Sequence, residues 1–347
     1  MDATFNEEQE QLAELADRIA RRIGTSIDPG ADRLAGWRLV ADAGLLGLRL
    51  APEAGGSGAG GIEVAIVAEA LGRQVSPVPY VGPVIAAELL RAAEAPDDVL
   101  EAVAEGHRRI SIGVDGTMSS LATSGATSEV VGWDCADAAE FAVLTPVDRA
   151  LGVALLAGPG LARDCADLSR SLVTLDPDAT RSVVGRPITE DRLVAVEALA
   201  LTLLSADMVG AMQGALDVAV EYAKQRVQFK RPIGSFQAIQ HLAADQHVSI
   251  EASRSATYYA AWAVDGLAPD RALMAARTAK AFVSTRAQEV VEAVLQIHGG
   301  IGHTWEHIGH YYLRRVLLDR FTLGDQQVQL AHIATDALAE RPGSGNQ

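Results

Sequence analysis

The sequence has few aromatic residues, few cysteines and few basic side chains. Aromatic residues make up 5% of its 347 positions, two positions are cysteine, and 29 Lys and Arg face 45 Asp and Glu, a net charge of −16. Nucleic acids and anionic membrane surfaces attract basic surfaces, so both classes of partner are disfavoured. Two cysteines in a chain of this length do not form a disulfide scaffold, which predicts a reducing compartment.

Long apolar runs and targeting signals are also missing. No uninterrupted apolar run reaches the ~18 residues that a membrane span needs. The first residues, MDATFNEEQEQ, lack the basic and apolar regions of a signal peptide. The chain is 49% hydrophobic, largely through Ala, Leu and Val, which favour packed helices. We therefore expect a cytoplasmic protein that is mainly α-helical.

Helical and strand patterns follow one another in three blocks. Asn6 and Gln9 have the spacing of a capping box, which predicts that a helix begins there. Short apolar runs with turn residues between them (RISIGVDG, EFAVLTPV, LGVALLA, RSLVTLDP) predict strands. The expected fold is mainly α with a small β domain, because helices and strands are segregated rather than alternating. The expected divisions are a helical domain over 1–104, a short β domain over 105–190, a helical bundle over 191–341 and a disordered tail over 342–347.

Two motifs suggest ligand sites that their surroundings argue against. The glycine-rich loop Gly55–Gly61 has no Lys-Ser/Thr and follows no strand, so it is interpreted as a connecting loop. His303, His307 and His310, with Glu306, would share one face of a helix and could bind zinc. Three glycines directly precede this string and break a helix, so structural histidines and no metal are expected.

Two further segments, RVQFKRPIGSFQ from Arg226 and QIHGGIG from Gln296, each allow two interpretations. The first is either a helix–helix turn with solvated charge or a place where an Arg fork holds a pyrophosphate. The second is either a plain helix stop or a bare backbone that a ligand can approach, with the Gln amide one turn away. Taken singly, the plain interpretations are favoured.

Taken together and in this order, the two segments resemble the motifs R-x-Q-F-G-x-P-I-x-x-x-Q and Q-x-x-G-G-x-G of the acyl-CoA dehydrogenase family. GLLGLRLAPEAGGSGAGG resembles the N-terminal motif of the family, so the resemblance extends over nearly the whole chain. It implies an N-terminal helical domain, a middle β domain, here shortened, and a C-terminal four-helix bundle. TWEH followed by YYLRR resembles a branch with bulky substrates, including steroid side-chain acyl-CoAs.

The resemblance implies removal of two hydrogens from an acyl-CoA, the α proton by a Glu and the β hydride by FAD. In the family, FAD lies at a dimer interface and one subunit reaches across to its partner's FAD. Lys230 stands where the family has Gly. The resemblance assigns these cross-subunit FAD contacts to Arg226, Gln228, Phe229, Phe236, Gln237, Gln296, Gly299 and Gly300.

The other half of the family's site does not carry over. The usual Glu position is Leu323, and the alternative position on an earlier helix is Ala200. The substrate-binding D-x-x-R falls on Ala198 and Leu201, and the T-E-P-x-x-G-S-D and W-I-(S/T) flavin segments are missing. No catalytic residue is therefore expected in this chain.

This one-sided loss predicts the non-catalytic subunit of a heterotetrameric (α₂β₂) acyl-CoA dehydrogenase. FAD would be shared with a catalytic partner chain, which would supply the Glu and bind most of the acyl-CoA. A first alternative is a self-sufficient homo-oligomer in which Asp325 or Glu197 acts as a displaced base. A second alternative is a scaffold subunit without flavin.

Overall fold

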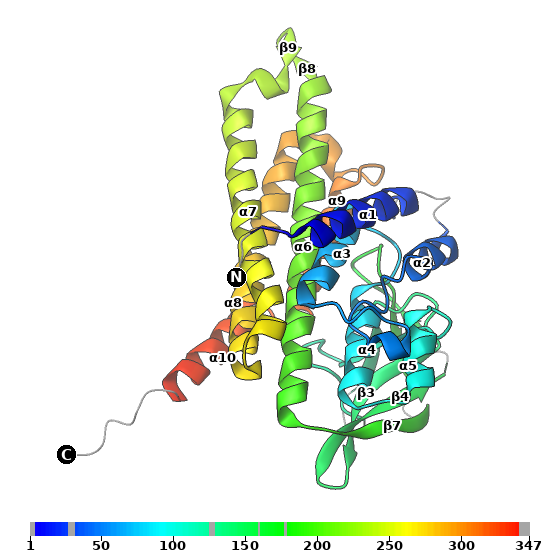
Figure 1. The fold of residues 1–347 in the computed structure, drawn as a ribbon. Helices are drawn as coiled ribbons and strands as arrows, with labels where there is room; N and C mark the ends of the chain where they lie inside the picture. The colour runs from blue at the N-terminus through cyan, green and yellow to red at the C-terminus, as the bar shows by residue number, and fades with distance from the viewer. Residues whose placement is uncertain (1–3, 27–31, 125–128, 159, 177–178, 340–347) are drawn as a thin grey trace, which may run out of the picture.

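The structure, a computed structural model, describes residues 4–26, 32–124, 129–158, 160–176 and 179–339 (Figure 1). The tail expected at 342–347 lies outside the described residues. The chain begins with α1 Glu7–Ile23, α2 Arg33–Asp42, η1 Pro52–Ala54, α3 Gly61–Arg73, α4 Val81–Ala92 and α5 Asp97–Ala104. The capping box is confirmed: the Asn6 side chain accepts from Gln9 N at 2.8 Å, and the Gln9 side chain accepts from Asn6 N at 3.1 Å.

A seven-stranded sheet follows, in the order β5-β6-β2-β1-β3-β4-β7. The pairs are antiparallel except for β1 with β3, where Ile110 lies beside Glu140. The four predicted runs contain β1, β3, β4 and β6, whereas β2, β5 and β7 were not predicted. The strands are β1 Ile110–Asp115, β2 Val130–Trp133, β3 Glu140–Val147, β4 Ala150–Ala157, β5 Leu161–Arg163, β6 Leu172–Thr174 and β7 Thr180–Ile188.

A helical bundle forms the rest of the chain and one side of the molecule (Figure 1). Its first helix, α6, runs from the end of β7 to a hairpin at the far tip, and its 36 residues span roughly 54 Å at ~1.5 Å per residue. The elements are α6 Glu190–Gln225, β8 Val227–Gln228, β9 Arg231–Pro232, η2 Ile233–Ser235, α7 Gln237–Gly266, α8 Pro269–His298, η3 Gly299–His303, α9 Gly309–Phe321 and α10 Gln326–Ala339.

Glycines allow α3 and α6 to cross with their backbones in contact. A Cβ on Gly210 would lie 2.0 Å from the Glu69 carbonyl oxygen, and one on Gly214 would lie 2.1 Å from that of Arg73. No side chain fits at these distances, so the crossing requires glycine. This contact between α3 and α6 holds the N-terminal helices against the bundle.

One described helix, α6, is long and apolar enough by composition to cross a membrane, although Glu197 and Asp207 interrupt its apolar residues. In this protein 78% of its most apolar stretch is buried. The helix therefore packs as the core helix of the bundle, in contact with α3, α8 and α9.

Candidate functional site

The Arg226 segment forms a two-residue β-hairpin at the tip of the molecule (Figure 1). Arg226 directly follows α6 as its C-cap, and its N–H donates to the Tyr222 carbonyl at 2.8 Å. Phe229 and Lys230 occupy the turn with φ of +51° and +66°. Two positive φ values are the geometry of a type I′ turn, which favours glycine. This explains why Lys230 is the position where the family carries Gly.

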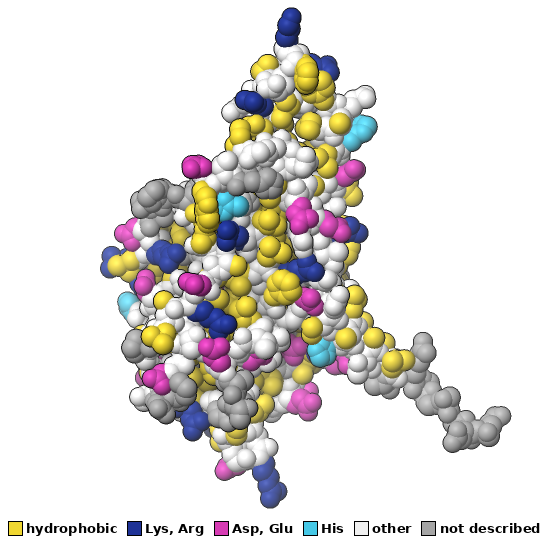
Figure 2. All heavy atoms as spheres, turned by 180° about the vertical axis from the view of Figure 1, so that it is seen from behind, with side chains coloured by type: hydrophobic (Ala, Val, Ile, Leu, Met, Phe, Trp, Pro, Cys, Tyr) yellow, Lys and Arg dark blue, Asp and Glu magenta, His cyan; other side chains and the backbone are white. Residues whose placement is uncertain are grey.

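The tip presents aromatic and basic side chains to solvent (Figure 2). Phe229 is 87% exposed, and its ring meets that of Phe236 edge to face at 6.2 Å. The Arg231 guanidinium lies over the Phe236 ring, 4.0 Å from its centroid. The Arg226 guanidinium makes no hydrogen bond or ion pair with any residue that the structure describes, and Gln228 is likewise exposed. The hairpin therefore holds a cation and an aromatic ring free for a partner molecule.

The Gly299 segment is an open backbone turn at the end of α8. Gly299 has φ of +63°, which requires glycine, and its N–H donates to the Gln296 carbonyl. A Cβ on Gly300 would meet no atom within 4 Å, so packing inside this chain does not require glycine there. The Gln296 side chain is exposed beside the turn. The bare backbone is accessible from outside the chain.

Ring contacts bring the two segments to the same end of the bundle. Tyr222, one turn before Arg226, lies 4.9 Å from the ring of His298, which directly precedes Gly299. Gln237 begins α7 and Phe236 precedes it, so both adjoin the hairpin. The eight residues assigned to FAD contacts by the resemblance thus fall on two neighbouring, exposed segments.

The two positions where a catalytic Glu was expected are buried. Leu323 is 6% exposed, and its N–H donates to the Met118 carbonyl at 2.7 Å, while its own carbonyl accepts from Gln329 Nε2 at 2.7 Å. Ala200 is fully buried in α6, as are Ala198 and Leu201 at the substrate-binding positions. Neither position offers a group that can take a proton.

Both candidate displaced bases have structural partners. The Asp325 carboxylate caps α10 by accepting from Gln327 N at 3.0 Å and Val328 N at 3.2 Å. Glu197 pairs with Arg277 at 3.1 Å near the surface of the bundle. No observation in this structure favours either residue as a catalytic base.

The histidine string is not on one helix. His303 ends η3, His307 lies in the turn before α9, and His310 is inside α9. His307 Nδ1 accepts from Gly309 N at 2.9 Å, and His310 Nε2 lies 3.2 Å from the Trp305 carbonyl oxygen. Among the described residues there is no metal-binding group of three or more His, Cys, Asp or Glu side chains.

The glycine-rich loop connects elements, as predicted. A Cβ on Gly56 would lie 2.1 Å from the Leu50 carbonyl oxygen, so the loop packs on the chain itself. Gly61 begins α3 and its N–H donates to Asp265 at 2.6 Å. The helix N-terminus that could have held a phosphate is already capped by a carboxylate.

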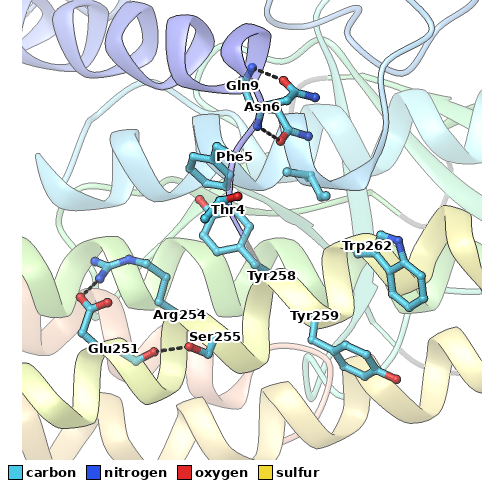
Figure 3. A pocket seen from close by; sticks show the side chains of 11 residues that line it. Thr4, Phe5, Asn6, Gln9, Glu251, Arg254, Ser255, Tyr258, Tyr259 and Trp262 are labelled. Carbon is cyan, nitrogen blue, oxygen red and sulfur yellow. Dashed lines mark hydrogen bonds and ion pairs between the residues drawn. The ribbon is translucent and has the colours of Figure 1, made fainter. Parts of the chain in front are cut away.

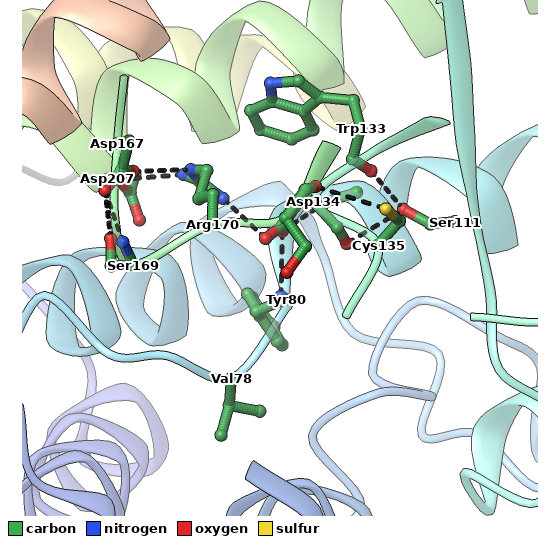
Figure 4. A network of polar contacts seen from close by, with 12 residues as sticks. Val78, Tyr80, Ser111, Trp133, Asp134, Cys135, Asp167, Ser169, Arg170 and Asp207 are labelled. Carbon is green, nitrogen blue, oxygen red and sulfur yellow. Dashed lines mark hydrogen bonds and ion pairs between the residues drawn. The ribbon is translucent and has the colours of Figure 1, made fainter. Parts of the chain in front are cut away.

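Sequence reasoning missed a buried ionic cluster where the three parts of the chain meet (Figure 4). Arg170, from the loop before β6, lies 2.9 Å from Asp134, 3.1 Å from Asp207 and 3.0 Å from Asp319. Its guanidinium also covers the Trp133 ring at 4.4 Å. Although burial opposes ionisation, Arg315 and Arg170 hold the pKa of the Asp207 carboxyl well below its usual range. The one sequence signal was Asp207 itself, a charge inside the apolar stretch of α6.

A buried lysine, Lys280, lies beside the loop that carries Leu323. Its Nζ donates to the carbonyl oxygens of Arg320 at 2.8 Å and Gly324 at 3.0 Å. Burial lowers the pKa of Lys280 to about 7, with the Asp325 carboxylate opposing the shift. The loop is thus held by an amine that is partly neutral at physiological pH.

An open groove of about 680 Å³ lies elsewhere, between the N-terminal arm and α7 (Figure 3). Its aromatic walls are Phe5, Tyr258, Tyr259 and Trp262, and Arg254 lies at one end. Arg254 pairs with Glu69 and Glu251. The groove begins 14 residues along α7 from Gln237, roughly 21 Å at ~1.5 Å per residue, so it is separate from the hairpin.

Comparison with known proteins decides the family. Residues 6–105 match the acyl-CoA dehydrogenase N-terminal domain, and residues 201–338 match the acyl-CoA dehydrogenase C-terminal domain. The acyl-CoA dehydrogenase IpdE2 of Mycobacterium tuberculosis is 32% identical over 314 residues, which are 88% of this chain and 86% of that protein. The chain belongs to the acyl-CoA dehydrogenase family. It is therefore a member of a family of flavoprotein oxidoreductases.

Solved structures of this family confirm the fold. A chain of the Tcur3481-Tcur3483 steroid ACAD G363A variant has a TM-score of 0.81 at 28% identity, covering 96% of this chain and 98% of that one. A chain of the ChsE4-ChsE5 complex from Mycobacterium tuberculosis also has a TM-score of 0.81, at 27% identity, covering 99% of this chain and 100% of that one. The predicted acyl-CoA dehydrogenase fold, mainly α with one sheet, is confirmed.

Proposed function

We propose that this chain is the non-catalytic subunit of a heteromeric, FAD-dependent acyl-CoA dehydrogenase. It contacts an FAD held mainly by a catalytic partner chain, and the partner supplies the Glu and most of the acyl-CoA pocket. The observation that carries the proposal is the contrast between the two halves of the site. The cross-subunit segments are largely exposed, and the Arg226 guanidinium has no partner among the residues that the structure describes, whereas the base positions, Leu323 and Ala200, are buried.

The exposed groups fit FAD chemically. The free Arg226 guanidinium suits a pyrophosphate, to which it can donate two parallel hydrogen bonds. The bare backbone at Gly300 allows close approach of a ligand, and Phe229 offers an apolar face. Bound FAD supplies the hydride acceptor of the reaction. This chain's residues bind and orient it, and proton removal falls to the partner because Leu323 carries no base.

The assembly and substrate class are inferred from the relatives. One similar structure is a steroid ACAD made of two differently named chains, and another is a complex of ChsE4 with ChsE5. These similarities support a heteromeric assembly that acts on a bulky acyl-CoA, such as a steroid side-chain acyl-CoA. We propose that the assembly is α₂β₂ and acts in the cytoplasm. Sharing one FAD between two chains follows from the single usable half-site in this chain.

The test is co-expression with an acyl-CoA dehydrogenase chain encoded nearby, followed by flavin counting. We expect one FAD per two chains. Arg226→Ala removes a charge-assisted hydrogen bond and should weaken FAD binding about 10- to 100-fold, the equivalent of ~1.5–3 kcal/mol. Gly300→Ala should also weaken it without changing the unfolding temperature, because the new Cβ meets nothing within this chain.

Arg149→Ala is the matched control, since Arg149 is an exposed arginine in the β3–β4 turn, at the opposite end of the molecule from the hairpin (Figure 1). FAD affinity that is unchanged in Arg226→Ala would contradict the proposal. So would an isolated chain that binds one FAD per chain and oxidises an acyl-CoA, which is the behaviour of a self-sufficient enzyme.

A further inference from the structure

The two segments proposed to contact FAD are about 60 residues apart in the sequence, yet one ligand requires them at a fixed separation. Three rings connect them. Tyr222 on α6 lies 4.9 Å from the ring of His298, with the planes tilted by 32°. His298 lies 4.3 Å from the ring of His307, at 61°. Such tilted and edge-to-face contacts between planar rings are attractive and define an orientation.

Two of these three residues, Tyr222 and His298, adjoin the FAD-contacting segments through the backbone. The Tyr222 carbonyl accepts from Arg226 N at 2.8 Å, which fixes the first residue of the hairpin segment. His298 directly precedes Gly299, so the position of its ring determines where the open turn begins. His298 is 4% exposed, and its Nδ1 lies 3.0 Å from the Val294 carbonyl oxygen, which makes this nitrogen a donor.

We propose that His298 and His307 are positioning residues that hold the Gly299–Gly300 turn against the Arg226 hairpin, so that both contact one FAD. The inference rests on the proposed function. It gives a role to His307, one member of the histidine string. Neither histidine touches FAD in this proposal; each acts through the backbone beside it.

Hydrogen bonding also requires His307 to be neutral. Its Nδ1 accepts the Gly309 N–H at 2.9 Å, and a protonated Nδ1 would be a second donor facing that N–H. The titratable groups facing the pair are Tyr222 on α6 and, acting on His307, His310 on α9. Burial lowers the pKa of both His298 and His307, and the charges of His298 and His310 lower that of His307 further. Acid should therefore separate the two segments only below the usual range of histidine.

The experiment measures FAD dissociation from the complex with the catalytic partner. His298→Ala removes the central ring and should weaken FAD binding about tenfold, whereas His298→Phe keeps a ring and should stay within about twofold of wild type. In wild type, affinity should fall only at pH values below the ordinary pKa of histidine, because burial lowers the pKa of both rings. His307→Phe has no titrating ring at this position, so its affinity should be lower at neutral pH but change less with pH.

A double-mutant cycle separates positioning from general loss of stability. If His298 acts by holding the turn against the hairpin, Arg226→Ala and His298→Ala should be non-additive in FAD affinity. Additive effects, or a loss in His298→Phe as large as in His298→Ala, would overturn the inference. Weakening by Arg226→Ala with none by His298→Ala would overturn this inference and leave the proposed function standing. No weakening by either would contradict both.

Discussion

Nη2 of Arg170, in the β domain, lies 3.0 Å from Oδ1 of Asp319, in α9, inside the protein and away from solvent. Asp319 also hydrogen-bonds to Asp207 on α6, so two carboxyl groups share one position in the cluster. Burial raises the pKa of Asp319 well above its usual range, against the attraction of Arg170. The pairs of Arg170 with Asp319 and of Arg315 with Asp207 thus lie inside the protein, and the first joins the β domain to the bundle.

Replacement of Asp319 by Asn should make stability less sensitive to pH. In wild type the folded state keeps a proton that the unfolded chain loses above about pH 3.9, so the free energy of unfolding falls as pH rises toward the folded pKa. Asn donates the same hydrogen bond without titrating. We expect Asp319→Asn to match wild type near pH 4 and to become relatively more stable at higher pH, by up to about 1.4 kcal/mol per unit.

Urea unfolding at several pH values measures this difference. Asp148→Asn is the control, since Asp148 is exposed and its φ of +55° suits Asn equally well. Parallel pH profiles of wild type and Asp319→Asn would show that Asp319 is ionised in the folded protein.

For Lys280 we expect the opposite pH dependence: the free energy of unfolding should rise with pH. Its folded pKa is about 7, while the unfolded chain keeps the proton up to about pH 10.4, so wild type gains stability as pH rises through this window. Lys280→Met keeps the apolar stem and removes the titration. Between pH 7 and pH 9, wild type should gain up to about 1.4 kcal/mol per unit relative to Lys280→Met.

Lys224→Met serves as the comparison, because Lys224 is exposed at the end of α6. If the stability difference between wild type and Lys280→Met does not change with pH, Lys280 is charged in the folded protein.

Replacing Lys230 by glycine, the residue that the family has at this position, should stabilise the hairpin turn. Lys230 has φ of +66°, a conformation that costs a side-chain-bearing residue roughly 1 kcal/mol and glycine almost nothing. The free energy of unfolding of Lys230→Gly should exceed that of Lys230→Ala by about 1 kcal/mol. Both variants lose the lysine charge, so their difference reports only the backbone conformation. Equal stabilities would mean that the turn does not adopt the left-handed conformation.

The crossing of α3 and α6 should not accept a methyl group. Gly210→Ala places a Cβ 2.0 Å from the Glu69 carbonyl oxygen, so the helices must separate, at a cost of about 1–3 kcal/mol or more. Gly300→Ala, with open space around its Cβ, should leave the unfolding midpoint unchanged. A Gly210→Ala variant as stable as wild type would contradict the close contact.

Local signals were predictable from the sequence and non-local ones were not. The capping box of Asn6 and Gln9 needs only four consecutive residues, so its pattern is complete in the sequence. Strand β7 is at the edge of the sheet and mostly exposed, so it lacks the alternation that a buried face imposes. In β2, Gly132 interrupts the apolar run because the Phe141 ring leaves no room for a side chain.

The candidate site divides in the same way. The Arg226 and Gly299 segments were located by motif, because each is contiguous. The contact between them depends on Tyr222 and His298, and neither residue is distinctive on its own. The ionic cluster draws its members from the segments around 134, 170, 207 and 319, so only the folded chain brings its charges together.

The backbone around Leu323 determines what a carboxylate at this position could do. Leu323 has φ of +56°, and its N–H and carbonyl are both bonded to other parts of the chain. A Leu323→Glu substitution would place a carboxylate in a buried site, where ionisation is costly. A carboxylate at this position could act as a base only if the loop also moved away from Met118 and Gln329, so one substitution would not be enough to create a base here.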